Sequence, residues 1–364
     1  MNVFRRLSLY RLLLLCSVVI AAGASLTALA LAVDSGPKPP AKPLAQAVHD
    51  ALSAPAVQGV SANIKLTDHL LEGAEIASGD GQGNSFASNP LLTGASGRLW
   101  VASDGRVRLE LQAEKGDTQI LYDGSTVSVY DASTNTLYRY KIPPDEQAER
   151  AGGSSDRHEV PSVAKIEEGI ARLSEHALLS GATPANVAGQ PAYTVRLSPK
   201  EGGSLIGGAE LSFDAAHGVP LRAAVYSSKS SAPVLELAAT EISYGPVDGS
   251  VFSFSPPAGV KLEEITIPES SAKDSESATD QAGQTKLSTH GHGVSAIELV
   301  EHRAADGERN QTPEGLPQVD INGTKASELR TALGTVLSFE RSGVRYLVAG
   351  ALDARAIETF ARGL

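Results

Sequence analysis

The stretch from Gly97 to Gln112 reads GRLWVASDGRVRLELQ and alternates apolar and polar residues almost without interruption. Alternation with a period of two places successive side chains on opposite faces of an extended strand. An Asp104-Gly105 pair breaks the pattern at its centre, and this dipeptide is typical of a tight hairpin turn. The segment therefore predicts two antiparallel strands with one apolar face, formed by Leu99, Val101, Val107, Leu109 and Leu111.

Similar strand patterns, separated by turn-forming residues, occupy most of the chain between residues 60 and 254. A first strand is predicted at 60–66, and a meander continues after the hairpin at 118–122, 126–130 and 136–142. A second run of strands is predicted at 191–198, 208–214, 220–227, 234–244 and 251–254. Apolar residues at helical spacing predict amphipathic helices at 44–52 and 163–179. The pattern indicates an α+β fold that is mostly antiparallel β.

The N-terminal residues indicate export from the cytoplasm. Arg5, Arg6 and Arg11 precede an uncharged apolar run from Leu12 to Val33, and basic residues favour the cytoplasmic side of such a run. Residues 1–33 are therefore predicted to be either a signal peptide or a membrane anchor, and the length suits both. We expect an extracytoplasmic protein in the cell envelope, secreted or anchored through residues 12–33.

Composition divides the rest of the chain. Residues 34–43 are Pro-rich and predict an extended spacer, and residues 44–265 carry the main domain, with polar loops expected at 73–97 and 143–161. Residues 266–293 are rich in Ser, Asp, Thr, Gln and Gly, which predicts a disordered linker. Residues 294–364 then predict a small α/β module, with strands at 297–300, 336–340 and 344–348 and helices at 326–333 and 354–360.

Several classes of function are disfavoured by the residues present. The net charge of −11 argues against a nucleic-acid partner. The one cysteine, Cys16, lies in the N-terminal apolar run, so the folded part has no disulfide or thiol chemistry. The eight histidines show no metal-ligand spacing, and no serine-nucleophile motif is present. We expect no catalytic residues, no metal and no cofactor: the chain is not predicted to be an enzyme.

The order of several soft motifs resembles a known family. VAGQPAY at 187–193 leads into a strand, a turn from Asp214 precedes Val-Pro-Leu-Arg, FSFSPPAG at 252–259 closes the domain, and YDGSTV occupies 122–127. Over residues 44–265 the chain is similar to the LolA-like family of exported lipoprotein carriers, and more narrowly to its actinobacterial members. The resemblance implies a curved antiparallel sheet, an incomplete barrel, with helices across its concave side. It also implies a cavity for acyl chains or lipidated protein ends, while other relatives bind sigma-factor regulators at the membrane.

An apolar sheet face is compatible with an ordinary core and with a ligand cavity, and the alternation leaves both open. The resemblance favours a carrier whose partner is a lipid or lipidated protein. The alternative is a membrane-tethered regulatory or sensory interaction protein with a membrane-protein partner. In a cavity, the ligand is expected to touch inward residues of the meander and of helix 163–179, which the loop before it would let act as a lid. These residues are Leu109, Leu111, Tyr122, Val129, Ile166, Ile170 and Leu173.

Overall fold

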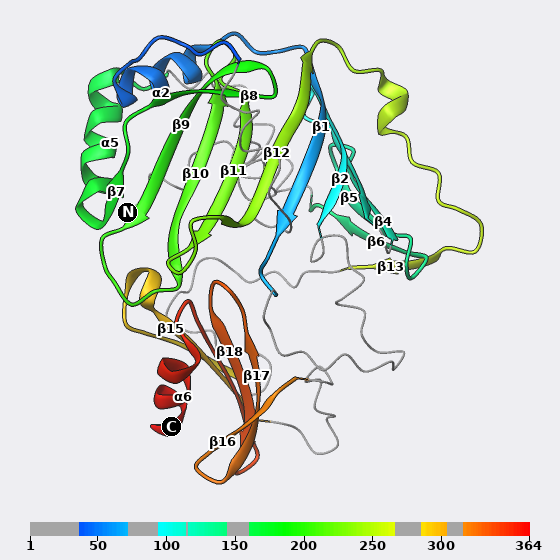
Figure 1. Ribbon diagram of the computed structural model, residues 1–364. Helices are drawn as coiled ribbons and strands as arrows, with labels where there is room; N and C mark the ends of the chain where they lie inside the picture. The colour runs from blue at the N-terminus through cyan, green and yellow to red at the C-terminus, as the bar shows by residue number, and fades with distance from the viewer. Residues whose placement is uncertain (1–35, 72–93, 114–115, 144–159, 266–284, 304–315) are drawn as a thin grey trace.

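Two mostly antiparallel sheets and three α-helices are the main elements of the described part of the chain in the computed structural model (Figure 1). The structure describes residues 36–71, 94–113, 116–143, 160–265, 285–303 and 316–364. The expected signal or anchor segment, most of the two polar loops and residues 266–284 of the expected linker lie outside these ranges. Among the described residues, no helix is both long enough and apolar enough to cross a membrane.

The larger sheet has 13 strands in the order β13-β6-β5-β4-β3-β2-β1-β12-β11-β10-β9-β7, with β8 paired to β9. Its first half contains α2 (Leu44–Ser53), β1 (Gly59–Asp68), β2 (Ala95–Ala102), β3 (Val107–Ala113), β4 (Gly116–Tyr122), β5 (Thr126–Asp131) and β6 (Thr136–Lys141). Its second half contains α5 (Val163–His176), β7 (Ala177–Leu179), β8 (Thr183–Val187), β9 (Gln190–Pro199), β10 (Ile206–Asp214), β11 (Pro220–Ser227) and β12 (Pro233–Tyr244). Strand β13 (Lys261–Glu264) returns to the first half and pairs in parallel with β6. The sheet curves but does not close, which confirms the predicted incomplete barrel.

The predicted hairpin is present as β2 and β3. Leu99 lies opposite Leu109, and Val101 opposite Val107. At the turn, the N–H of Ala102 donates to the carbonyl of Arg106 at 2.9 Å, while Gly105 adopts φ +90°, a conformation that favours glycine. The sequence pattern and the turn residue therefore act together to fix the register.

Strand β1 joins the two halves of the sheet, because it pairs with β2 on one side and with β12 on the other. Val60 lies between Val101 and Tyr244, and the register shifts between Asn63 and Ile64 on the β12 side. Such a bulge increases the local twist of a strand. It lies at the middle of the sheet, between the two meanders.

The apolar face of this sheet carries its core. One buried cluster lies on β1, β2 and β3 and includes Ile64, Leu66 and Leu111. A second forms where α2 lies over β9 and β10, with Ala47 packed against Tyr193 and Phe213. Helix α2 thus packs on β9 and β10 in the second half of the sheet.

The segment from residue 249 to residue 259, here named the strap, crosses the other face of the first meander. The Arg108 guanidinium donates to the carbonyl of Val251 at 2.7 Å, and the rings of Tyr130 and Phe254 lie 5.7 Å apart. The predicted strand at 251–254 is wrong: the strap begins with the 3-10 helix η3 (Gly249–Phe252) and continues without regular structure. The following Pro256 and Pro257 lack the N–H donors that a strand ladder needs.

The smaller sheet has six strands in the order β14-β15-β19-β18-β17-β16, covered by one helix. Its elements are β14 (Thr285–His290), η4 (Gly293–Ser295), β15 (Ile297–Arg303), β16 (Gln318–Ile321), β17 (Thr324–Arg330), β18 (Thr335–Arg341), β19 (Val344–Gly350) and α6 (Ala354–Arg362). Its core lies between the sheet and α6, and contains Leu299, Ile321, Ala326, Leu337, Phe339, Val348, Ile357 and Ala361.

Two predictions for this module are wrong. The expected helix at 326–333 is mostly strand β17, in which Ala326 pairs with Phe339 and Glu328 with Leu337. Good helix formers there adopt a strand because pairing with β18 and burial beneath α6 outweigh local propensity. The expected linker also ends earlier than predicted, because residues 285–290 form β14, whose alternation was obscured by its small polar side chains.

The two sheets meet at a seam formed by the turn between β9 and β10. The Ser204 hydroxyl shares its one proton between the carbonyls of Val294 (3.1 Å) and Ala351 (3.0 Å). The Leu205 N–H donates to Ala351 at 2.7 Å. Both Ser204 and Leu205 are buried. The smaller sheet is therefore attached to the larger one by hydrogen bonds as well as by the chain.

Candidate ligand-binding face

The apolar face of β1 to β6 presents two unbroken rows of apolar side chains. Cross-strand pairing aligns Val60, Val101, Val107, Tyr122, Val127 and Tyr140 in the first row. It aligns Ala62, Leu99, Leu109, Ile120, Val129 and Tyr138 in the second. Neighbouring strands lie about 4.8 Å apart, so each row spans about 24 Å across six strands.

The rows become more exposed toward the outer strands. Leu109 is 8% exposed and Leu111, which follows it on the same face, is 1% exposed. Tyr122 and Val129, on β4 and β5, are only half-buried. At the β1–β3 end four row residues are buried and Leu99 and Val107 are half-buried, whereas at the β4–β6 end every row residue is half-buried and keeps apolar surface within reach of solvent.

Four of the seven predicted ligand residues, Leu109, Leu111, Tyr122 and Val129, are brought together on this face. The other three, Ile166, Ile170 and Leu173, lie on α5, whose main packing partners are α2 and β7 (Figure 1). Strand β7 pairs with β9 at the far edge of the sheet, so α5 does not lie over the meander. None of its residues is buried, and Leu173 is 40% exposed.

The two rows contain more side chains than the predicted ligand residues. Val127, which alternation also assigns to the apolar face, and Tyr140 extend the first row, and Tyr138 extends the second. These residues could have been predicted from the sequence. The alternation of apolar and polar residues continues across the two short turns between β4, β5 and β6, so it also assigns the residues of β5 and β6 to a face. The tyrosines add polar hydroxyls at the exposed end of the apolar surface.

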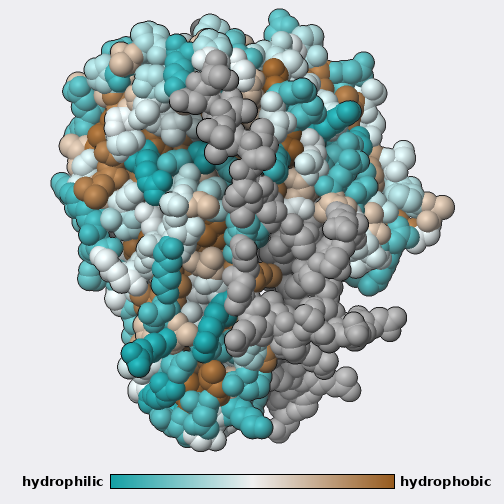
Figure 2. Space-filling view, viewed as in Figure 1, coloured by the Kyte–Doolittle hydropathy of each residue, from teal (hydrophilic) through white to brown (hydrophobic). Residues whose placement is uncertain are grey.

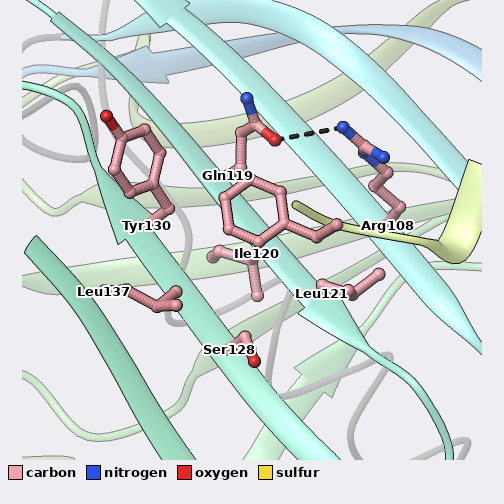
Figure 3. Close-up of a pocket in the computed structure, with 8 residues that line it drawn as sticks. Arg108, Gln119, Ile120, Leu121, Ser128, Tyr130 and Leu137 are labelled. Carbon is pink, nitrogen blue, oxygen red and sulfur yellow. Dashed lines mark hydrogen bonds between the residues drawn. The ribbon is translucent and has the colours of Figure 1, made fainter. Parts of the chain in front are cut away.

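The opposite face of the meander carries polar groups that are already paired. Between it and the strap lies a small cavity of about 10 Å³ (Figure 3), too small for more than about one water molecule. Its walls include Arg108, whose guanidinium donates to the side-chain carbonyl of Gln119 at 3.1 Å. Tyr130 and Leu137 lie beside them in the same view. We interpret this cavity as a packing gap beneath the strap.

Polar groups also dominate the corresponding face of the second half. Glu210 accepts hydrogen bonds from Arg222 (2.8 Å), Tyr226 (2.7 Å) and Arg196 (2.9 Å). Burial by itself would raise the pKa of Glu210, but these donors outweigh that effect and lower it. Such a saturated network holds strands together rather than offering free groups to a ligand.

Exposed apolar side chains elsewhere are dispersed. Among the described residues, those that are large and exposed are Leu173, Leu178, Leu262, Ile265, Leu287, Val294, Leu347 and Leu364. They belong to several separate elements of both sheets, and the side shown in Figure 2 is mostly polar with small apolar patches. In the described ranges, no group of three His, Cys, Asp or Glu side chains is placed to hold a metal ion.

Comparison with known proteins gives structural neighbours only. No protein-family model and no curated protein matches the chain. The chain is similar to a solved complex of Pseudomonas aeruginosa MucA and MucB, with 15% identity over 87% of this chain and 95% of that one, at a TM-score of 0.39. A structure of MucB alone matches at 13% identity over 88% and 96% of the two chains, at 0.38. A LolA superfamily protein from Nitrosomonas europaea matches at 10% identity over 85% and 91%, at 0.19.

Proposed function

We propose that this protein is an extracytoplasmic carrier that holds the acyl chains of a lipid or lipidated protein against the apolar face of β1 to β6. The observation that carries the proposal is the pair of unbroken apolar rows, which remain partly exposed at Tyr122 and Val129. Each acyl methylene that leaves water against such a surface contributes about 0.8 kcal/mol. The described residues offer this face no catalytic constellation, and the proposed role is binding without chemistry.

Filling the exposed end of the rows tests the proposal. The Val129→Trp substitution should occupy the surface that an acyl chain would cover, and should raise the dissociation constant for a fluorescent fatty acid by about tenfold or more. Because Val129 is half-buried, the larger ring can be accommodated toward solvent. Thermal unfolding of the variant checks that the fold is retained.

Gln112→Trp provides the matched control. Gln112 is exposed and lies on the polar face of β3, so the same indole there should leave fatty-acid binding unchanged. If both variants bind like the unaltered chain, or if the unaltered chain binds no acyl ligand, the carrier proposal is wrong.

A membrane-tethered regulatory interaction protein is the second candidate. The observation that favours it is the smaller sheet, which has its own core and is hydrogen-bonded to the larger one through Ser204 and Leu205. A carrier that only binds acyl chains does not require an attached second domain. Cell fractionation separates the candidates: full-length protein in the membrane pellet favours the regulator, and a shortened soluble form favours the carrier.

A further inference from the structure

A cavity of about 400 Å³ opens at the seam between the two sheets. The larger sheet contributes Leu205 and Lys229 to its walls. The smaller sheet and α6 contribute Arg330, Thr331, Thr335, Asp353, Ala354, Arg355 and Glu358. The volume is within the range of small-molecule sites, and the cavity shares no residue with the two apolar rows.

The walls are held in place by hydrogen bonds. Thr335 is 2% exposed, and its hydroxyl donates to the carbonyl of Leu352 at 2.9 Å. The tip that carries Lys229 is fixed because the Ser228 N–H donates to the carbonyl of Leu205 at 2.8 Å. The cavity therefore exists before any ligand arrives, which reduces the entropy that binding must offset.

The charges around the cavity are unevenly satisfied. Arg330 lies 2.6 Å from Glu328 and 3.6 Å from Glu358. Glu358 is also 2.7 Å from Arg362. The guanidinium of Arg330 and the carboxylates of Glu328 and Glu358 are thus committed to one another.

Two cations are left over. Within the described ranges, the side chains of Lys229 and Arg355 have no hydrogen-bond or ion-pair partner, although both line the cavity. Asp353, the remaining acid, directs Oδ1 to the N–H of Ala356 at 3.0 Å. One of these cations comes from each sheet domain, and both side chains are exposed to solvent at the cavity.

We propose that this cavity binds a phosphate-bearing ligand and that the bound phosphate bridges Lys229 and Arg355 across the seam. A phosphate group can accept charge-assisted hydrogen bonds from both side chains at once, and arginine suits its geometry. The cavity exceeds the size of the ion alone, so a phosphate ester fits its volume. A ligand that contacts both domains stabilises them in one relative arrangement. The phosphate site is independent of acyl-chain binding on the apolar face of β1 to β6.

Isothermal titration with inorganic phosphate and with glycerol 3-phosphate, at constant ionic strength, tests the proposal on the full chain. Each of Lys229→Gln and Arg355→Gln should raise the dissociation constant by about tenfold, since each removes one charge-assisted bond. Lys325→Gln is the control: Lys325 is exposed at the other end of β17 and on its other face, and its loss should leave binding unchanged. Co-sedimentation with vesicles that contain phosphatidic acid distinguishes two sources of the phosphate. If the ligand is a lipid head group, the protein should sediment with the vesicles, and this should depend on Lys229 and Arg355. If the ligand is a soluble phosphate ester, the protein should not sediment with them.

Acetate serves as the test of ligand class. If acetate binds as well as phosphate, the assignment to phosphate is overturned. If phosphate does not bind, or if all three glutamine variants weaken phosphate binding equally, the proposed site is wrong. Circular dichroism of each variant establishes that the comparison is made between folded chains.

Discussion

Asp68, the last residue of β1, is a carboxyl group that the fold buries without fully satisfying it. It is 4% exposed; Oδ1 accepts from the N–H of Leu70, and Oδ2 has no hydrogen-bond partner within the described part of the chain. Burial raises the pKa of Asp68 to about 7, and the single N–H donor lowers it only in part. One side chain thus links the stability of the fold to pH.

The sign of this linkage gives a prediction. Between about pH 4 and pH 7 the folded chain keeps the Asp68 proton while the unfolded chain releases it, so the free energy of unfolding should fall as the pH rises through this window. In Asp68→Asn, which keeps the Oδ1 acceptor and cannot titrate, this component should be absent. Urea unfolding of both chains from pH 4 to pH 8 measures the difference, which should grow up to about pH 7 and then stay level. A difference that does not change with pH would contradict the assignment.

At the scale of elements, alternation and turn chemistry predicted most of the larger sheet. They located β2 to β6 and put Leu109 and Val129 on one face, because the period of two survives each short turn. Sequence patterns could not place α5. An apolar stripe indicates that one face of a helix packs against the protein, but it does not indicate which surface that face contacts. Sequence patterns also misread β17, where pairing with the neighbouring β18 and burial of Ala326 in the core of the smaller sheet decided the conformation.

The different surroundings of β3 and α5 predict different tolerance to a larger residue. Leu111 is 1% exposed within a closed cluster, so Leu111→Phe should lower the free energy of unfolding by about 1–3 kcal/mol through overpacking. Ile170 lies on a helix without buried residues, and Ile170→Phe should change the free energy of unfolding by no more than about 0.5 kcal/mol. Urea denaturation compares the two. Equal losses would mean that the stripe of α5 is packed as tightly as the core of the sheet.

On the scale of the whole molecule, the seam decides whether the two sheets unfold together. The Ser204 hydroxyl shares its one proton between the carbonyls of Val294 and Ala351, and its oxygen accepts from the N–H of Ile206 at 3.1 Å. Each sheet has a separate core, and domains with separate cores unfold as one unit only when their interface is strong enough.

Removing that hydroxyl should uncouple the sheets. We expect Ser204→Ala to lower the free energy of unfolding by about 1–3 kcal/mol, because the carbonyl of Val294 loses its hydroxyl donor and that of Ala351 keeps only the N–H of Leu205. Thermal unfolding should then split into two transitions in differential scanning calorimetry. Ser243→Ala removes an exposed hydroxyl from β12 and should leave the unfolding profile unchanged. Identical profiles for the two variants would show that the seam is held by other contacts.

The position of β1 between β2 and β12 has a consequence for how the chain reaches its fold. Each meander is built from neighbours in sequence and can form early, but Val60 meets Tyr244 only after the whole second half exists. Closing a contact between such distant residues is slow, because the loop entropy is lost before the pairing is gained. Until then, the edge of β1 that later pairs with β12 is unpaired. Only when synthesis has passed β12 can this edge be protected from pairing with another molecule.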